Sequence, residues 1–151
     1  MNVLILTSSN RNFPIDIHQE ITKAGQNAIR FTQLADFFSS PLRQRPYLAI
    51  LEIGNPEDVQ RGILAYEWTH GEEIPCRFLL LLSSKYLQLG EKALRFAGTE
   101  TAVLPMASKN LLFKIELQLK LLLSDKPKMP TSTQVFRADV SSFERQRVLK
   151  L

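Results

Sequence analysis

The sequence has little cysteine, little histidine and no glycine-rich motif, and each shortage excludes a class of site. Its single cysteine, Cys76, excludes an intramolecular disulfide and a cysteine-based zinc cage. The two histidines, His18 and His70, have no second ligand beside them at metal-binding spacing. A P-loop, a G-x-G-x-x-G motif and a G-x-S-x-G elbow are all absent. We therefore expect no cofactor and no bound metal.

Long hydrophobic runs and strong charge are missing as well. No segment reaches the roughly 18 apolar residues that a membrane span needs, and the N-terminus lacks the basic region of a signal peptide. The net charge is +4 and the basic residues are scattered, so we do not expect nucleic acid as a partner of residues 1–123. We expect a cytoplasmic protein with no membrane partner.

The 151 residues suit one domain followed by a tail. Hydrophobic residues make up 44% of the chain, enough for a core within residues 1–123. From Ser124 to Thr133 the sequence is polar with two prolines, which is typical of a linker. Residues 124–151 are therefore interpreted as a linker and the start of a further segment, basic in character, with a helix possible from about residue 142.

Residues 47–53 form the central element of the predicted fold. This apolar run ends in Glu52-Ile53 and is followed by a Gly-Asn-Pro turn, a pattern typical of a strand buried on both faces. Similar strands are expected at 3–6, 27–31, 76–82 and 101–104, alternating with helices at 14–24, 33–40, 56–69, 90–97 and 110–123. The alternation predicts an α/β fold, a doubly wound parallel sheet with right-handed crossovers. Two strand orders are plausible for such a sheet, and the flavodoxin-like (βα)5 order 2-1-3-4-5 fits the count of five strands.

With these landmarks in this order, residues 1–123 resemble a response-regulator receiver domain. The landmarks are Leu51-Glu52-Ile53-Gly54-Asn55-Pro56, Ser83-Ser84, Ala97-Gly98 and Val103-Leu104-Pro105. In receivers an Ala-Gly pair precedes the fifth strand, and a Lys-Pro pair with a cis peptide bond closes it. The resemblance implies a role in two-component signal transduction.

The residues that carry receiver chemistry are replaced in this sequence. Receivers use two acids to hold magnesium, an aspartate to accept the phosphoryl group, a hydroxyl and a lysine to contact it, and an aromatic switch residue. These positions fall on Thr7 and Ser8, Glu52, Ser83, Leu104 and Thr101. Without the acid pair and the lysine, magnesium and a phosphoryl group lose most of their charge partners. The resemblance therefore implies a degenerate pseudo-receiver that acts independently of phosphorylation.

Glu52 allows several interpretations. Because glutamate is one methylene longer than aspartate, its carboxylate lies roughly where a phosphoryl group would. It is either a built-in phosphate mimic hydrogen-bonded to Ser83, or a solvated acid that remained after the chemistry was lost. An alternative function is a receiver-like domain that senses a small ligand in the crevice at Thr7, Ser8, Glu52 and Ser83. An active phospho-acceptor or small hydrolase using Glu52 or Ser83 is a third hypothesis.

The last predicted helix carries two apolar stripes. One stripe should face the sheet, and Phe113, Leu117 and Leu121 form a second at i, i+4 and i+8. A second apolar face predicts a partner, which is another copy, the tail or the rest of the protein. Receivers commonly pair through their fourth helix, fifth strand and fifth helix, so the resemblance points to the same surface. The leading interpretation is a non-catalytic protein-interaction module that dimerises or docks through this helix. It would be the N-terminal regulatory domain of a larger bacterial regulator, with an output domain beyond the tail.

Overall fold

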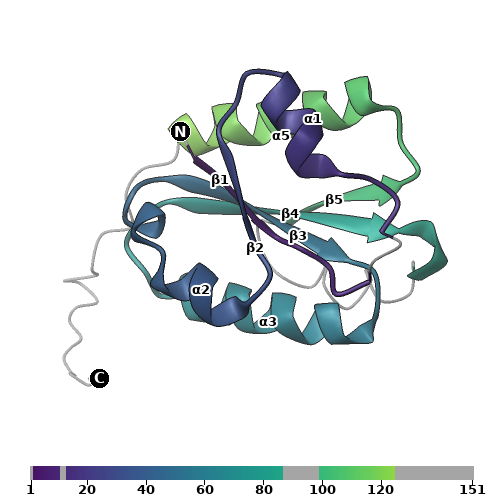
Figure 1. The fold of residues 1–151 in the computed structure, drawn as a ribbon. Helices are drawn as coiled ribbons and strands as arrows, with labels where there is room; N and C mark the ends of the chain where they lie inside the picture. Colours follow the sequence, from purple (N-terminus) through teal and green to yellow (C-terminus); the bar gives the residue numbers. More distant parts are fainter. Residues whose placement is uncertain (1, 11–12, 87–98, 125–151) are drawn as a thin grey trace.

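A computed structural model describes residues 2–10, 13–86 and 99–124 (Figure 1). They form a five-stranded parallel sheet of order β2-β1-β3-β4-β5. The strands are β1 (Asn2–Leu6), β2 (Ala28–Phe31), β3 (Tyr47–Ile53), β4 (Cys76–Ser83) and β5 (Thr99–Leu104). The helices are α1 (Ile17–Lys23), α2 (Leu34–Ser39), α3 (Pro56–His70) and α5 (Ser108–Ser124), with short 3-10 turns at Pro41–Gln44 and Ser84–Tyr86. The predicted fold class and strand order are confirmed.

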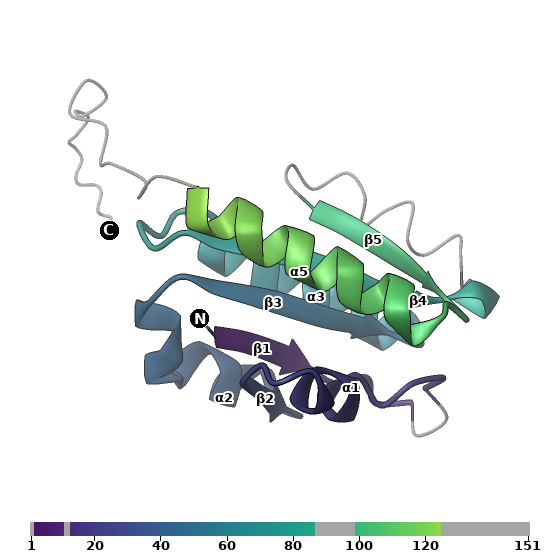
Figure 2. The same ribbon diagram turned by 90° about the horizontal axis from the view of Figure 1, so that it is seen from above.

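The helices cover both faces of the sheet. Helices α1 and α5 lie on one face and α2 and α3 on the other (Figures 1 and 2). Alternate strand residues point to opposite faces, so two cores form. The first core joins Ile5, Ile50 and Leu81 to α1 and α5, and the second joins Leu51 and Leu80, among others, to α2 and α3. All seven residues of β3 are buried, as its apolar sequence predicts.

Polar caps decide where two of the helices begin. The Asp16 side chain accepts a hydrogen bond from the Gln19 amide, so α1 begins at Ile17 and not in the turn that Pro14 was expected to start. Asn55 caps α3 in the same way, accepting from the Asp58 amide at 2.9 Å. Gly25, just after α1, has a φ of +85°, the left-handed conformation expected there.

The C-terminal part differs in detail from the sequence-based expectation. Helix α5 begins at Ser108, so Ser108 is its first residue and not its cap. The Ala107 carbonyl accepts from the Asn110 and Leu111 amides. The expected helix at 90–97 and the tail at 125–151 lie outside the described residues. Over the described ranges, no helix is long and apolar enough to cross a membrane.

The strand register brings the candidate site positions of the sequence analysis to one edge of the sheet. Leu6 pairs with Leu51, Glu52 with Leu81, and Ser83 with Leu104. The carboxyl ends of β1, β3, β4 and β5 therefore lie together, where open α/β sheets form their sites. The Leu104–Pro105 peptide bond is cis, as the resemblance implies.

Candidate functional site

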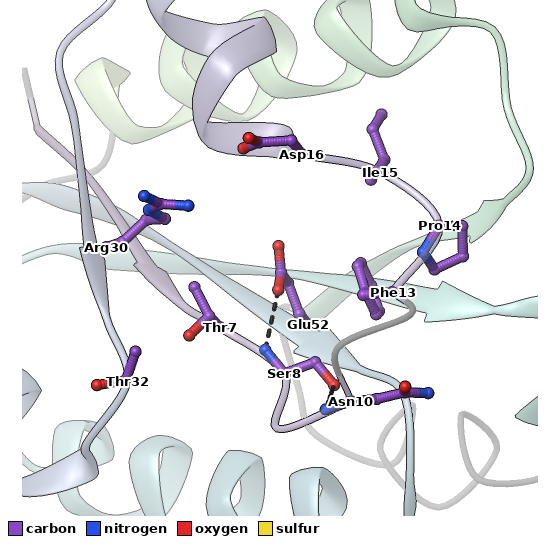
Figure 3. Close-up of a pocket in the computed structure, with 10 residues that line it drawn as sticks. All are labelled: Thr7, Ser8, Asn10, Phe13, Pro14, Ile15, Asp16, Arg30, Thr32 and Glu52. Carbon is purple, nitrogen blue, oxygen red and sulfur yellow. Dashed lines mark hydrogen bonds between the residues drawn. The ribbon is translucent and has the colours of Figure 1, made fainter.

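Glu52 is buried at the end of β3, with only 8% of its surface exposed. Strand alternation places its side chain on the same face as Ile50, under α1. The Ser8 backbone amide donates a hydrogen bond to Glu52 Oε1 at 2.9 Å (Figure 3). Glu52 is therefore not the solvated acid that one interpretation expected.

The surroundings of Glu52 change its acidity. Burial, the largest cause, acts together with the nearby carboxylates of Asp58 and Asp16 to raise the pKa of its carboxyl group from 4.5 to about 7. The Ser8 amide and the guanidinium of Arg30 oppose this rise by stabilising the charged form. Both protonation states of Glu52 are therefore populated near neutral pH.

The hydrogen bond expected between Glu52 and Ser83 is not formed among the described residues. Glu52 pairs in register with Leu81, two residues before Ser83, and its carboxylate is held instead by Ser8. Leu104, which the resemblance places at the position of the receiver lysine, is 1% exposed and belongs to the core under α1 and α5. Ser83 of β4 thus pairs in register with a hydrophobic residue of β5, Leu104.

Thr101, which the resemblance places at the position of the receiver switch residue, lies in the middle of β5. Its neighbour Ala102 faces the core under α1 and α5, so Thr101 faces the opposite side of the sheet. Its Oγ1 atom is buried, and within the described part of the chain it has no hydrogen-bond partner. The position to which the resemblance assigns the aromatic switch residue therefore holds a small polar side chain with a buried hydroxyl group.

Asp58 is the site residue that sequence reasoning missed. It lies in the first turn of α3 and is 2% exposed. Its Oδ2 atom accepts hydrogen bonds from the Ser8 hydroxyl and, at 2.8 Å, from the Gly54 amide. Its Oδ1 atom accepts from the Ser9 amide at 3.2 Å. Asp58 therefore joins the loop after β1 to the turn after β3.

Arg61, one turn further along α3, supplies the positive charge for Asp58. Its guanidinium lies 3.3 Å from Asp58 Oδ1 and donates to the carbonyl oxygens of Thr7 at 3.0 Å and Thr32 at 2.8 Å. These contacts connect α3 to the segments that follow β1 and β2. A buried carboxylate needs such a partner because an unpaired buried charge is strongly destabilising.

The sequence did contain a signal for this cluster. A helix N-cap followed three residues later by an acid, here Asn55 and Asp58, is the spacing of a capping motif. The glycine at position 54, between the strand and the helix cap, is a second signal, because such a glycine often marks a close approach of two chain segments. In the structure an added Cβ would lie 2.7 Å from Ser8 Oγ, so glycine allows the close approach of the Ser8 loop.

A crevice of about 680 Å³ opens between the loop after β1, the start of α1 and the end of β2. We call it the β1–α1 crevice. Its polar lining includes Thr7, Ser8, Asp16, Arg30 and Glu52, and Phe13, Pro14 and Ile15 line its apolar side (Figure 3). Ser83, which was expected to share this crevice, is not part of the lining. Within the described residues, no group of three or more acids, histidines or cysteines could hold a metal ion.

A stripe of apolar side chains is exposed on α5, as its sequence predicts. Leu111, Ile115, Leu119 and Leu122 are buried against the sheet. On the other side of the helix, Phe113 is 65%, Leu117 41% and Leu121 37% exposed in the single chain. We call these three residues the α5 stripe.

Comparison with known proteins gives structural matches only. No family model matches the sequence, and no curated protein sequence matches it. A signal receiver domain of a protein assigned as a Luxo repressor, from Vibrio parahaemolyticus, is 18% identical over 81% of this chain and 92% of its own, with a TM-score of 0.63. The receiver domain of a modulated diguanylate cyclase from Desulfovibrio desulfuricans is 18% identical over 83% and 98%, with a TM-score of 0.56.

A response regulator from Colwellia psychrerythraea matches at 17% identity and a TM-score of 0.55, covering 79% of this chain and 97% of its own. At such identities the likeness establishes the fold. The described residues therefore adopt the fold of response-regulator receiver domains.

Proposed function

We propose that this chain is a non-catalytic signalling module that pairs with a second copy of itself through α5. The receiver-like fold supports a signalling role. The observation that carries the proposal is the α5 stripe, in which Phe113, Leu117 and Leu121 expose apolar side chains on a helix whose other face is already buried. A contiguous exposed apolar surface of this kind favours a protein partner.

The composition of the site supports action without phosphoryl transfer. Thr7 and Ser8 replace the two metal-binding acids of receivers, and Leu104 replaces the lysine. The Ser8 hydroxyl is engaged with Asp58, and its amide with Glu52. The site is thus held together by contacts within the protein, and we propose that the module is a pseudo-receiver.

A second copy is the partner that the stripe fits best. In an antiparallel pair of α5 helices with the two-fold axis at Leu117, Phe113 of one copy lies opposite Leu121 of the other, and Leu117 meets its own equivalent. Beside the stripe, Lys114 Nζ lies 3.9 Å from Glu100 Oε2 of β5. This ion pair partly neutralises the lysine and so reduces the repulsion between the Lys114 side chains of two copies. Residues 124–151 would then lead to the output domain of a larger bacterial regulator.

Two experiments test this function. Intact mass spectrometry after incubation with acetyl phosphate and magnesium should find no phosphoryl adduct, and a magnesium-dependent adduct would contradict a non-catalytic role. Sedimentation equilibrium of the full chain should find a dimer that Leu117→Glu dissociates. A different protein bound to the stripe would instead leave the isolated chain monomeric.

A further inference from the structure

The β1–α1 crevice places opposite charges around one open space. Glu52 lies at its floor, Asp16 at the start of α1 and Arg30 on β2, and all three side chains point into the same region (Figure 3). Glu52 Oε1 is bonded to the Ser8 amide, whereas Oε2 has no hydrogen-bond partner within the described residues. This second oxygen belongs to a side chain that is more than nine-tenths buried and faces the crevice.

Arg30 completes the arrangement. Across the described residues, no ion pair within 4.0 Å joins its guanidinium to Asp16 or Glu52. Its positive charge nevertheless acts on Glu52, since Arg30 lowers the pKa of the Glu52 carboxyl group whereas Asp16 raises it. The crevice therefore offers carboxylates that can bind a cation and a guanidinium that can bind an anion. These groups do not form an ion pair with each other, so both remain available to a ligand.

We propose that the β1–α1 crevice binds a free α-amino acid with an apolar side chain. The ammonium group lies between Glu52 and Asp16, and the carboxylate pairs with Arg30. The side chain packs against Phe13 and Ile15. This inference goes beyond the proposed function, because it gives the module a small-molecule input that is separate from the α5 stripe.

Other ligand classes satisfy fewer of these groups. A simple anion would pair with Arg30 but would meet the carboxylates of Glu52 and Asp16. A simple amine would pair with the carboxylates and leave Arg30 unpaired. A divalent cation would have at most two carboxylates here, because no group of three or more acids, histidines or cysteines gathers among the described residues, and Arg30 would repel it. A zwitterion with an apolar side chain uses both charges and the apolar wall.

Isothermal titration calorimetry with the full chain tests the proposal directly. The probes are L-leucine, isopentylamine, which lacks its carboxylate, and isocaproate, which lacks its ammonium group. L-leucine should bind saturably, and each analogue should bind about tenfold or more weakly, because each loses one charge-assisted pair. An absence of saturable binding by L-leucine, or equal binding of isopentylamine, would overturn the proposal.

Variants assign the two ends of the ligand. Arg30→Gln should weaken L-leucine binding about tenfold or more and leave isopentylamine binding unchanged, which a general loss of structure would not do. Arg45→Gln is the matched control, since Arg45 is exposed and lies outside the crevice lining. If Arg30→Gln binds L-leucine as tightly as the unmodified chain, the assigned role of Arg30 is wrong.

The pH dependence supplies a second readout. The groups that face Glu52 are Asp16 of the α1 cap, Arg30 of β2 and Asp58 of α3. Because ionised Glu52 pairs best with the ammonium group, the affinity for L-leucine should rise between pH 6 and pH 8, around the Glu52 pKa of about 7. In Glu52→Gln this rise should be absent. A rise that persists in Glu52→Gln would remove Glu52 from the ligand site.

Discussion

The Ser8 hydroxyl donates a hydrogen bond to Asp58 Oδ2, and this contact joins the end of β1 to the first turn of α3. The backbone amide of the same residue donates to Glu52 Oε1 at 2.9 Å. Ser8 therefore holds two carboxylates with two different donors. The position that the resemblance assigns to a metal-binding acid is, in this chain, a hydrogen-bond donor that closes the site.

The first prediction concerns Asp58. Replacing Asp58 with alanine should lower the free energy of unfolding by about 3 kcal/mol, because the Ser8 hydroxyl and the Gly54 amide lose their acceptor and Arg61 loses its charge partner. Urea denaturation measures this change. The control is Glu57→Ala, an exposed neighbour that should cost about 0.5 kcal/mol or less. Equal midpoints for the two variants would show that the Asp58 cluster does not stabilise the fold.

The second prediction concerns the turn after β3. In Gly54→Ala the new Cβ would lie 2.7 Å from Ser8 Oγ and 3.1 Å from Phe13 Cδ1, so the Ser8 loop must move. We expect a loss of about 1–3 kcal/mol in the free energy of unfolding. Gly71→Ala, where nothing lies within 4 Å of the new Cβ, should leave stability nearly unchanged. Thermal denaturation of the two variants decides, and similar melting temperatures would argue against the close approach.

The third prediction concerns the protonation of Glu52. Its pKa in the folded protein is about 7, against 4.5 for the ordinary group, so the folded state favours the protonated form. The contribution of protonated Glu52 to the free energy of unfolding is fully present below pH 4.5 and is lost as the pH rises through 7. Glu52→Gln, which cannot ionise, should gain about 3 kcal/mol relative to the unmodified chain between pH 4.5 and pH 8.

Urea denaturation of both chains across this pH range measures the gain. Titration of other groups cancels in the comparison, because it is common to both proteins. A difference in stability between Glu52→Gln and the unmodified chain that stays constant with pH would mean that the Glu52 pKa is ordinary.

The fourth prediction concerns two threonines, Thr101 and Thr69, whose hydroxyl groups have opposite environments. Thr101 Oγ1 has no hydrogen-bond partner within the described residues, so Thr101→Val should raise the free energy of unfolding by about 1 kcal/mol. Thr69 Oγ1 donates to the carbonyl oxygens of Ala65 and Tyr66, each at 3.0 Å. Thr69→Val should therefore lower it by about 1 kcal/mol. Effects of the same sign, measured by chemical denaturation, would contradict this assignment.

The sequence was sufficient to predict the fold because the apolar runs in it coincide with the buried strands of the structure. Residues 47–53 are apolar apart from Glu52 and are buried throughout. The order 2-1-3-4-5 was predicted because it fits five strands that alternate with helices, and the sheet has this order. The exposed positions of Phe113, Leu117 and Leu121 followed from helical periodicity in the same way.

The site was harder to predict because it depends on contacts between distant segments. Asp58 looked like one acid in an exposed first turn, yet the approach of Ser8, fifty residues earlier, buries it. Glu52 was expected near Ser83, but the backbone amide of Ser8 takes its carboxylate. Backbone amides carry no sequence signal, so such a partner becomes visible only in three dimensions.

The α5 stripe provides the most direct test of the proposed pairing. Sedimentation equilibrium should compare the full chain with Leu117→Glu and with Leu64→Glu. Leu117 is 41% exposed on α5 and Leu64 is 43% exposed on α3, so the two variants are matched in exposure and differ in surface. We expect the unmodified chain and Leu64→Glu to have close to twice the 17.2 kDa mass of one chain, and Leu117→Glu to be a monomer. An unmodified chain that is monomeric, or a Leu117→Glu variant that remains a dimer, would contradict pairing through α5.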